Sequence, residues 1–311
     1  MIPQKDRERI IFGCGYFGGI GSSPDLLGKG EGREQAHQLL NLAREFGLAR
    51  FDTANTYGGG RSEEYLGSWL SEQGSAYRQS IQIATKVGNP TGTRAGHTPL
   101  SRIEITTQIE ESLRRLRTDY VDVYYVHEID PSTPLVETIE AFAEVLAGGK
   151  AQFLGLSNVD LPYVKEFLEL ADETTRRRLL YVQNEFNFLQ QRDRRELIPF
   201  LQTRSLRYAV FSPLAGGLLT GKYQWNSGFP PGSRLTLRPE PYRAFLNQEA
   251  FDRIQDLKTL SEKNGRSLPE EALRFVLDTQ GVDSVIIGPR CREHFESLGF
   301  RISNSLKSGV P

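Results

Sequence analysis

The chain has 311 residues, which is enough for two ordinary domains or for one large α/β barrel with a substantial core. Its 38 basic and 39 acidic residues nearly cancel, so no overall field would attract nucleic acid or an anionic membrane, and we expect a compact neutral partner. Only Cys14 and Cys291 are present and no run approaches the roughly 18 apolar residues of a membrane span, so we expect a cytoplasmic protein rather than a disulfide-stapled secreted one.

Short runs rich in β-branched and aromatic residues alternate along the chain with longer segments of helical periodicity. This alternation is typical of repeated βα units around a parallel sheet. The predicted strands are residues 9–13, 49–53, 80–85, 121–126, 152–156, 180–183, 207–211 and 284–287. Eight such units predict a closed parallel (β/α)8 TIM barrel, formed by residues 1–311 as a single domain.

Three helices between these strands have clear start signals. The first begins near Ser62, where two acidic residues follow and suit the helix dipole. The second covers residues 101–117, and Ser101 with Glu104 predicts a capping box at its start. Pro134 opens the third.

One stretch does not fit a simple βα unit. Residues 223–247, called the strap below, are rich in Pro, Gly and Arg and lack any periodicity. Such a length is unusual for a structureless connection. We therefore expect a functional lid or a loop that covers a cofactor.

Four polar side chains stand at or just beyond the ends of predicted strands. Asp52, Lys86 and His127 end the second, third and fourth strands, and Tyr57 lies in the turn five residues after Asp52. In a closed parallel barrel the C-terminal strand ends converge on one face, and that face holds the active site. We therefore expect these four residues to meet there.

This set of side chains predicts proton delivery. A free tyrosine has a pKa of about 10, too high for an effective proton donor near neutrality. The ammonium of Lys86, if nearby, would lower the pKa of Tyr57, and the carboxylate of Asp52 would pair with this ammonium and hold it in place. His127 would hydrogen-bond and polarise a substrate carbonyl oxygen. Taken singly, each residue is equally compatible with a cap, a packing residue or a solvated charge.

These residues and their flanks resemble the aldo-keto reductase superfamily. FDTANTYGGGRSEEYLG resembles the segment around its catalytic Asp and Tyr, ATKVG its Lys segment and RRLRTDYVDVYYVHEID its His segment. GKAQFLGLSN, YVQNEFN, FSPLAGGLLTGKY and VIIGPR follow in the family's order. The resemblance implies a barrel enzyme that binds NADPH across the C-terminal face and moves a hydride between nicotinamide and a carbonyl carbon. It also implies that Asp52, Tyr57, Lys86 and His127 form the catalytic tetrad, with Tyr57 as general acid in reduction.

The resemblance further implies which residues bind the cofactor, NADP(H). Ser157, Asn158 and Gln183 match residues that hydrogen-bond the nicotinamide carboxamide. Phe211 takes the position of an aromatic residue, often Tyr, that stacks on the nicotinamide ring, and stacking needs only the π face.

Residues 212–222 resemble the family's pyrophosphate loop, in which glycines let backbone N–H groups approach phosphate and a lysine adds charge. The positions expected to contact the cofactor there are Ser212, Leu214, Gly216, Leu218, Gly221 and Lys222. Arg234 would then lie in the strap that covers the cofactor.

The segment after the eighth strand matches the family's adenosine end in part. Gly288, Arg290 and Arg292 lie near a helix N-terminus and would hold a 2′-phosphate, which favours NADPH over NADH. Two solvated surface arginines are the alternative. Glu296 matches a family acid on the adenine side, but Leu298 stands where the family usually has Asn.

Substrate choice in such barrels comes from loops. Tyr16, Phe17 and Trp225 are the predicted substrate-pocket residues, and an aromatic cluster with few charges suggests a hydrophobic or sugar-like carbonyl compound. The segments EIDPSTPLVETIEAF and SPLAGGLLTGKY resemble the branch of aflatoxin-aldehyde reductases and bacterial deoxysugar ketoreductases. Aldehydes, diketones and keto-sugars are therefore expected. About nine residues precede the first strand, too few for the family's usual hairpin, so we expect the barrel floor to be covered differently or less.

Two other functions remain open at this stage. Lys86 could act as a Schiff-base nucleophile in a lyase barrel. Alternatively, the chain could resemble the channel-regulatory subunits of the same superfamily, which bind the cofactor and a protein partner. No metal site, nucleic-acid partner, membrane partner or oligomeric state is predicted.

Overall fold

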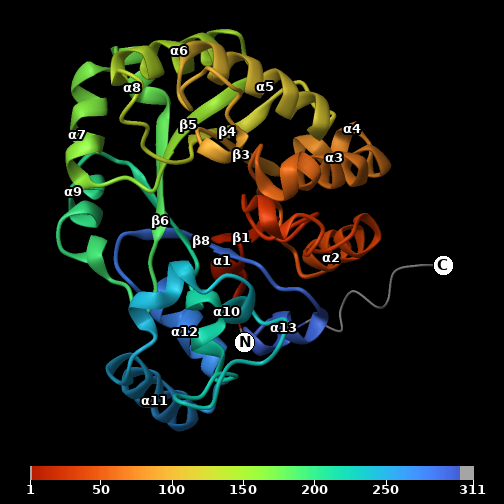
Figure 1. Ribbon diagram of the computed structural model, residues 1–311, viewed down its shortest axis with the longest axis vertical. Helices are drawn as coiled ribbons and strands as arrows, with labels where there is room; N and C mark the ends of the chain where they lie inside the picture. The colour runs from red at the N-terminus through yellow and green to blue at the C-terminus, as the bar shows by residue number, and fades with distance from the viewer. Residues whose placement is uncertain (1, 302–311) are drawn as a thin grey trace.

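The computed structural model describes residues 2–301, which form a closed barrel of eight parallel strands ringed by helices (Figure 1). The strands are β1 (Ile10–Gly13), β2 (Arg50–Asp52), β3 (Gln82–Val87), β4 (Val121–Val126), β5 (Ala151–Ser157), β6 (Leu179–Glu185), β7 (Arg207–Phe211) and β8 (Val282–Ile287). Each overlaps its predicted range, so the predicted (β/α)8 barrel is confirmed. Residues 1 and 302–311, which the single-domain prediction also includes, lie outside the described part.

Helices connect the strands on the outside of the barrel (Figure 1). They are α1 (Gln4–Arg7), α2 (Arg33–Glu45), α3 (Arg61–Gln73), α4 (Ser75–Gln79), α5 (Arg102–Leu116), α6 (Leu135–Ala147), α7 (Leu161–Leu170), α8 (Glu173–Arg178), α9 (Leu197–Thr203), α10 (Arg234–Leu237), α11 (Gln248–Lys263), α12 (Leu268–Leu277) and α13 (Arg292–Ser297). Short 3₁₀ helices are η1 (Pro24–Leu26), η2 (Tyr57–Gly60), η3 (Pro90–Gly92), η4 (Arg192–Arg194), η5 (Ala215–Thr220) and η6 (Glu240–Phe245). Within residues 2–301 no helix combines the length and the apolarity that crossing a bilayer requires.

Strand residues alternate between two hydrophobic cores because successive side chains point to opposite faces. Phe12, Phe51 and Tyr124 belong to the core between the strands and the helices. Residues of the opposite parity, among them Tyr125 and Tyr181, form a separate core. We place this second core inside the barrel, because in such barrels the inward side chains fill the interior.

The N-terminal end of this inner core is closed by a polar cluster. Arg50 and Arg207, at the starts of β2 and β7, both donate to the hydroxyl of Tyr181, over 2.8 and 3.1 Å. No strand precedes β1 within residues 2–9, and α1 is held to α12 by a 2.8 Å ion pair between Asp6 and Arg274. Residues 2–9 thus contain one short helix and no hairpin.

The predicted capping box at the start of α5 is wrong. Ser101 is the N-cap residue, but its hydroxyl donates to the carbonyl of Thr98 instead of accepting from the helix. Glu104 is buried and pairs with Arg94. A carboxylate of α6, that of Glu137, accepts from the backbone N–H of Arg102 over 2.9 Å, so a neighbouring helix satisfies this end of α5.

The strap is anchored by a third hydrophobic core beside β7 and β8. It contains α10 and η6 and is therefore less irregular than its composition predicts. Tyr223, Leu235 and Tyr242 of the strap are buried against η5, α11 and α12, which lie together on one side of the barrel (Figure 1).

A close approach of α3 and α5 depends on Gly67. A Cβ atom at this position would lie 2.1 Å from the carbonyl oxygen of Arg115. We expect Gly67→Ala to lower the free energy of unfolding by about 1–3 kcal/mol, although alanine is the better helix former, because this overlap forces the two helices apart. Urea denaturation measures the change.

Gly148→Ala is the control, since Gly148 has a φ of −74° and a Cβ there would meet no atom closer than 3.4 Å. Its free energy of unfolding should change by less than about 0.5 kcal/mol. Equal stability of the two variants would contradict the close helix contact.

Candidate active site

The four residues predicted to deliver a proton do come together at the C-terminal ends of neighbouring strands. Asp52 ends β2, Lys86 lies one residue before the end of β3, and His127 follows β4. Tyr57 begins η2, the turn after β2. Asp52, Lys86 and His127 are only 4, 1 and 6% exposed, so their charges and hydrogen bonds act in a medium with little water.

The Lys86 ammonium is the centre of this cluster. It donates to Asp52 Oδ1 over 2.5 Å, to the carbonyl of Thr53 over 2.8 Å and to the hydroxyl of Tyr57 over 3.4 Å. An ammonium has three N–H donors, so all of them are used. The second oxygen of Asp52 accepts from Gln183 Nε2 over 2.9 Å.

Lys86 stays charged in spite of its burial. Burial alone would lower the pKa of Lys86, but the Asp52 carboxylate and the Tyr57 phenol raise it above its ordinary value. The ammonium is therefore present throughout the neutral range, and it balances the carboxylate beside it.

The expectation that Tyr57 has a lowered pKa is wrong in its net direction. Burial raises the pKa of Tyr57, and the lowering influence of Lys86 is too small to reverse this in the ligand-free protein. The phenol is therefore protonated at neutral pH. Because its oxygen accepts from Lys86, its own hydrogen remains free to be donated to another acceptor.

His127 is a neutral donor beside that phenol. Its ring meets the Tyr57 ring edge to face, with 5.5 Å between centroids and 79° between planes. Burial and the charge of Lys86 hold the pKa of His127 well below its ordinary value. Among the described residues, Nδ1 of this ring has no hydrogen-bond partner. A neutral imidazole carries one N–H, which can donate to a carbonyl oxygen.

Glycines place the Tyr57 turn. Gly58 and Gly59 have φ angles of 59° and 68°, in the left-handed region that favours glycine. A Cβ at Gly58 would lie 2.3 Å from the carbonyl oxygen of Phe17. The GGG run after Tyr57 is thus a steric requirement for bringing the phenol over β3.

The residues predicted to bind nicotinamide lie on the neighbouring strand ends. Ser157 ends β5 and pairs in register with Gln183 of β6, while Phe211 ends β7. Asn158 has a φ of 56°, and its side-chain N–H donates to the carbonyl of His127 over 2.9 Å. Gln183 donates to Asp52 Oδ2 over 2.9 Å. These amides are held by hydrogen bonds to the proton-delivery cluster.

The predicted pyrophosphate loop has a backbone suited to an anion. Ser212, Gly216, Gly217 and Gly221 all have positive φ, between 56° and 96°, and successive N–H groups in such a conformation form an anion-binding concavity. Lys222 Nζ lies 3.0 Å from where a Cβ of Gly217 would be. Leu214 and Leu218 of this loop were also predicted to contact the cofactor. Leu218 belongs to the third hydrophobic core, and Leu214 packs against that core and the main one.

Arg234 extends this basic region from the strap. Its guanidinium lies 5.2 Å from the ring centroid of Tyr16, and the Arg290 guanidinium lies 4.9 Å from the same centroid. Nη1 of Arg234 is buried without a hydrogen-bond partner among the described residues. A buried, unsatisfied donor on a cation next to a glycine loop fits a phosphate group. The residues present therefore fit a dinucleotide.

The predicted 2′-phosphate residues have carboxylate partners. Nε of Arg290 pairs with the buried Glu31. Arg292 pairs with Glu45 at the end of α2 over 2.6 Å. Three other positions at this end are the exposed Gly288 and Glu296 and the buried Leu298. Leu298 belongs to the main core, which explains why an apolar residue can stand where the family usually has Asn.

The aromatic residues predicted for the substrate pocket have different surroundings. Tyr16 lies between Arg234 and Arg290. Phe17 is 1% exposed and packs in the main core. Trp225 packs on Phe251 of α11, with 5.4 Å between ring centroids.

Two residues near the cluster were missed from the sequence. Tyr125 of β4 has the same parity as His127, which follows that strand, so the alternation of side chains could have placed Tyr125 inside the barrel. Arg238 belongs to the strap, and its charge acts on the Tyr57 phenol. No local pattern marks Arg238, because the strap has no periodicity.

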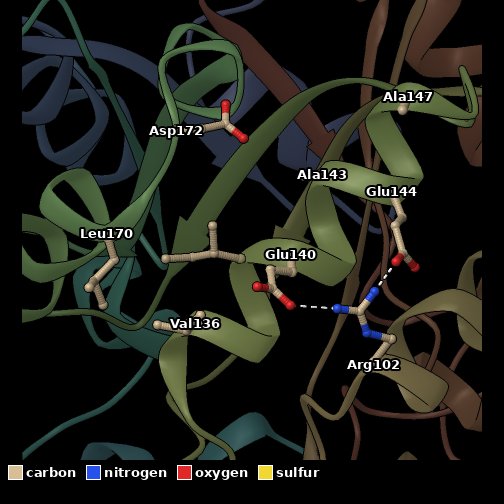
Figure 2. Close-up of a pocket in the computed structure, with 9 residues that line it drawn as sticks. Arg102, Val136, Glu140, Ala143, Glu144, Ala147, Leu170 and Asp172 are labelled. Carbon is tan, nitrogen blue, oxygen red and sulfur yellow. Dashed lines mark hydrogen bonds and ion pairs between the residues drawn. The ribbon is translucent and has the colours of Figure 1, made fainter.

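A separate cavity of about 550 Å³ lies on the outer helical layer (Figure 2). Its lining residues come from α5, α6, the end of α7 and the segment that joins α7 to α8, with Val136 and Leu170 as apolar members. Arg102 crosses one side and pairs with Glu140 and Glu144 (Figure 2). None of the four clustered residues lines this cavity, so we assign no catalysis to it.

Comparison with known proteins gives one consistent result. The model of the Aldo/keto reductase family matches residues 9–306. L-glyceraldehyde 3-phosphate reductase of Escherichia coli K12 is 32% identical over 270 residues, covering 85% of this chain and 77% of that protein. A probable voltage-gated potassium channel subunit beta of Arabidopsis thaliana is 33% identical, covering 82 and 78%. The solved glycerol dehydrogenase of Gluconobacter oxydans superposes with a TM-score of 0.75 at 25% identity, covering 94 and 85%.

The buried ion pair yields a stability prediction. Lys86→Met should lower the free energy of unfolding by about 3–5 kcal/mol, because it leaves the Asp52 carboxylate buried without a counter-charge. The double variant Asp52→Asn/Lys86→Met should recover part of this loss, since neither charge remains. Urea denaturation at neutral pH is suitable, because the raised pKa of Lys86 means that its contribution is complete there and is lost only in alkaline solution, as the pH rises through that pKa.

Arg177→Met is the matched control for this pair. It breaks an exposed ion pair with Glu173, whose two side chains are 77 and 62% exposed. Its free energy of unfolding should change by less than about 0.5 kcal/mol. The single variant Asp52→Asn completes the comparison. If the double variant lost as much free energy of unfolding as Lys86→Met and Asp52→Asn lose in sum, the two charges would not be coupled.

Proposed function

Because the chain belongs to the aldo/keto reductase family, we propose that it is an NADPH-dependent reductase that converts an aldehyde or ketone to the alcohol, with Tyr57 as the general acid. One observation carries this proposal. The Tyr57 oxygen accepts a hydrogen bond from Lys86, so the phenol hydrogen is free beside the neutral ring of His127. Relatives named as a reductase and a dehydrogenase support the reaction class.

Different side chains would polarise the carbonyl oxygen and deliver a proton to it. His127 donates a hydrogen bond that orients and polarises this oxygen. As negative charge develops there, the Tyr57 O–H bond breaks and the new alcohol O–H bond forms. The phenolate left behind is stabilised by the Lys86 ammonium, which Asp52 holds in position. In the oxidative direction the same phenolate would act as the base.

A nicotinamide dinucleotide would supply the hydride. Ser157, Asn158 and Gln183 would hold its carboxamide, and Phe211 would lie against its ring. Lys222, Arg234 and the backbone of the glycine loop would hold its pyrophosphate. The preference for NADPH is supported by Arg290, because only its Nε is engaged by Glu31 and the rest of the guanidinium can meet a 2′-phosphate.

The two alternative functions differ in their support. A Schiff-base nucleophile must be a neutral amine, whereas the pKa of Lys86 is raised and all three of its N–H groups are used. This argues against a lyase. A regulatory role has the similarity to a channel beta subunit in its favour. Binding a partner does not require the arrangement of Tyr57 and Lys86, so we favour catalysis.

The substrate candidates remain aldehydes, diketones and keto-sugars. The name of the Escherichia coli relative adds a small phosphorylated aldehyde to them.

Tyr57→Phe tests the general acid. The variant should bind NADPH as the parent protein does, because the ring remains, and should lose about two to four orders of magnitude in carbonyl reduction, because the proton donor is gone. Fluorescence titration gives the NADPH affinity, and NADPH oxidation across a panel of aldehydes and ketones gives the turnover.

Tyr120→Phe is the control for this variant, since Tyr120 packs beside Arg78 and has no contact with the cluster. It should retain full activity. Activity of Tyr57→Phe equal to that of the control would exclude Tyr57 as the proton donor, and absence of turnover in the parent protein would favour the regulatory role.

Arg290→Ala tests the choice of cofactor. We expect the affinity for NADPH to fall about tenfold or more, since a charged contact to the 2′-phosphate is lost, while the affinity for NADH changes little. Fluorescence titration with both nucleotides measures this. Equal losses for NADPH and NADH would show that Arg290 does not bind the 2′-phosphate.

A further inference from the structure

The strap carries a cation, Arg238, for which residues 2–301 provide no counter-charge. Arg238 follows α10 and is half-buried. Among residues 2–301 its guanidinium has no ion pair and no side-chain hydrogen bond. Of the other two strap arginines, Arg243 lies 3.9 Å from Glu240, and Arg234 lies against the ring of Tyr16, beside the glycine loop.

Arg238 lies against the β1–α2 loop, which in turn contacts the turn that carries Tyr57. Its Nη1 lies 2.8 Å from where a Cβ of Gly21 would be. Gly21 in turn accepts from the backbone N–H of Gly58, next to Tyr57, over 3.0 Å. The guanidinium therefore lies one loop away from the phenol, on the side covered by the strap.

The charges around the phenol of Tyr57 do not balance, because that of Arg238 has no partner among the groups that act on the phenol. The charges that act on Tyr57 are those of Lys86, Asp52 and Arg238. Lys86 and Asp52 are paired and cancel one another, and His127 is neutral. Among the described groups that act on the phenol, Arg238 is thus the charge without a partner of opposite sign. A partly desolvated guanidinium is costly unless an anion meets it, and carboxylate and phosphate match its planar donors.

We propose that Arg238 binds an anionic group of the substrate, so that the preferred substrate is a small aldehyde or ketone with a phosphate or carboxylate at the end remote from its carbonyl. This inference rests on the proposed reductase function. The carbonyl lies between Tyr57 and His127, and the anion lies toward the strap. Arg238 is then a specificity-determining residue, and it revises the expectation of a pocket with few charges.

The test compares two small anionic aldehydes with a small neutral one. Glyceraldehyde 3-phosphate, succinic semialdehyde and glyceraldehyde are assayed with NADPH in the parent protein and in Arg238→Met, Arg238→Lys and Arg243→Met. Arg238→Met keeps the bulk of the side chain and removes its charge. We expect kcat/KM for one or both anionic aldehydes to fall about tenfold or more in Arg238→Met, through KM, while glyceraldehyde is unaffected.

Arg238→Lys should restore part of the loss, because it restores the charge without the planar fork. Arg243→Met, the matched control from the same strap, should behave as the parent protein. The comparison of glyceraldehyde 3-phosphate with succinic semialdehyde shows whether a phosphate or a carboxylate is bound. Equal losses for glyceraldehyde and for both anionic aldehydes, or no preference of the parent protein for either, would overturn the proposal.

Binding without turnover separates this inference from the proposed function. Calorimetry of the cofactor-free protein with glycerol 3-phosphate, succinate and glycerol should show anion binding that Arg238→Met abolishes and Arg243→Met retains. Such binding in a protein that reduces no carbonyl would retain the anion site and reject the reductase. Turnover in which Arg238→Met leaves kcat/KM for the anionic aldehydes unchanged would support the reductase and reject the anion site. If Arg238→Met instead weakened the affinity for NADPH, the anion would be the cofactor's phosphate and the proposal would be wrong.

Discussion

The ion pair between Lys86 and Asp52 is the interaction on which the rest of the site depends. Burying either charge alone would be costly, and each makes the other tolerable inside the barrel. The pair also orients the ammonium, which donates to Asp52 and Thr53 and, with its third N–H group, to the phenol of Tyr57. A cation held in this way needs no rearrangement when charge develops on the phenol. Neighbouring strands hold both partners, so the closed sheet itself keeps them in place.

Much of this architecture follows from patterns that are local in the sequence. β-branched and aromatic runs mark all eight strands, and the polar residues at their ends mark the mouth of the barrel. The capping box at Ser101 failed because a carboxylate from α6 serves that helix end, which is a tertiary effect. The pKa of Tyr57 was expected to fall because a neighbouring charge is visible in the sequence, whereas the extent of burial is not. Arg238 was missed because its place depends on the fold of an aperiodic strap.

The raised pKa of Tyr57 agrees with its proposed role as an acid. A phenol that had already lost its hydrogen at neutral pH would have nothing to give. Burial keeps the proton on the oxygen, and Lys86 reduces the cost of removing it, so the two opposing influences act at different moments. The same division holds for His127, whose burial and positive neighbour keep it neutral and thus leave the only formal charges of the cluster on Lys86 and Asp52.

The two guanidinium groups that meet Tyr181 have a consequence for the path by which protons reach the site. They place two positive charges at the N-terminal end of the barrel, at the hydroxyl of a tyrosine of the inner core. If Tyr57 gives up a hydrogen ion in each cycle, a replacement that came from this end would be repelled by both cations, so we expect it to enter by the C-terminal face. Reprotonation of Tyr57 would then share one face with the entry and release of the other reactants.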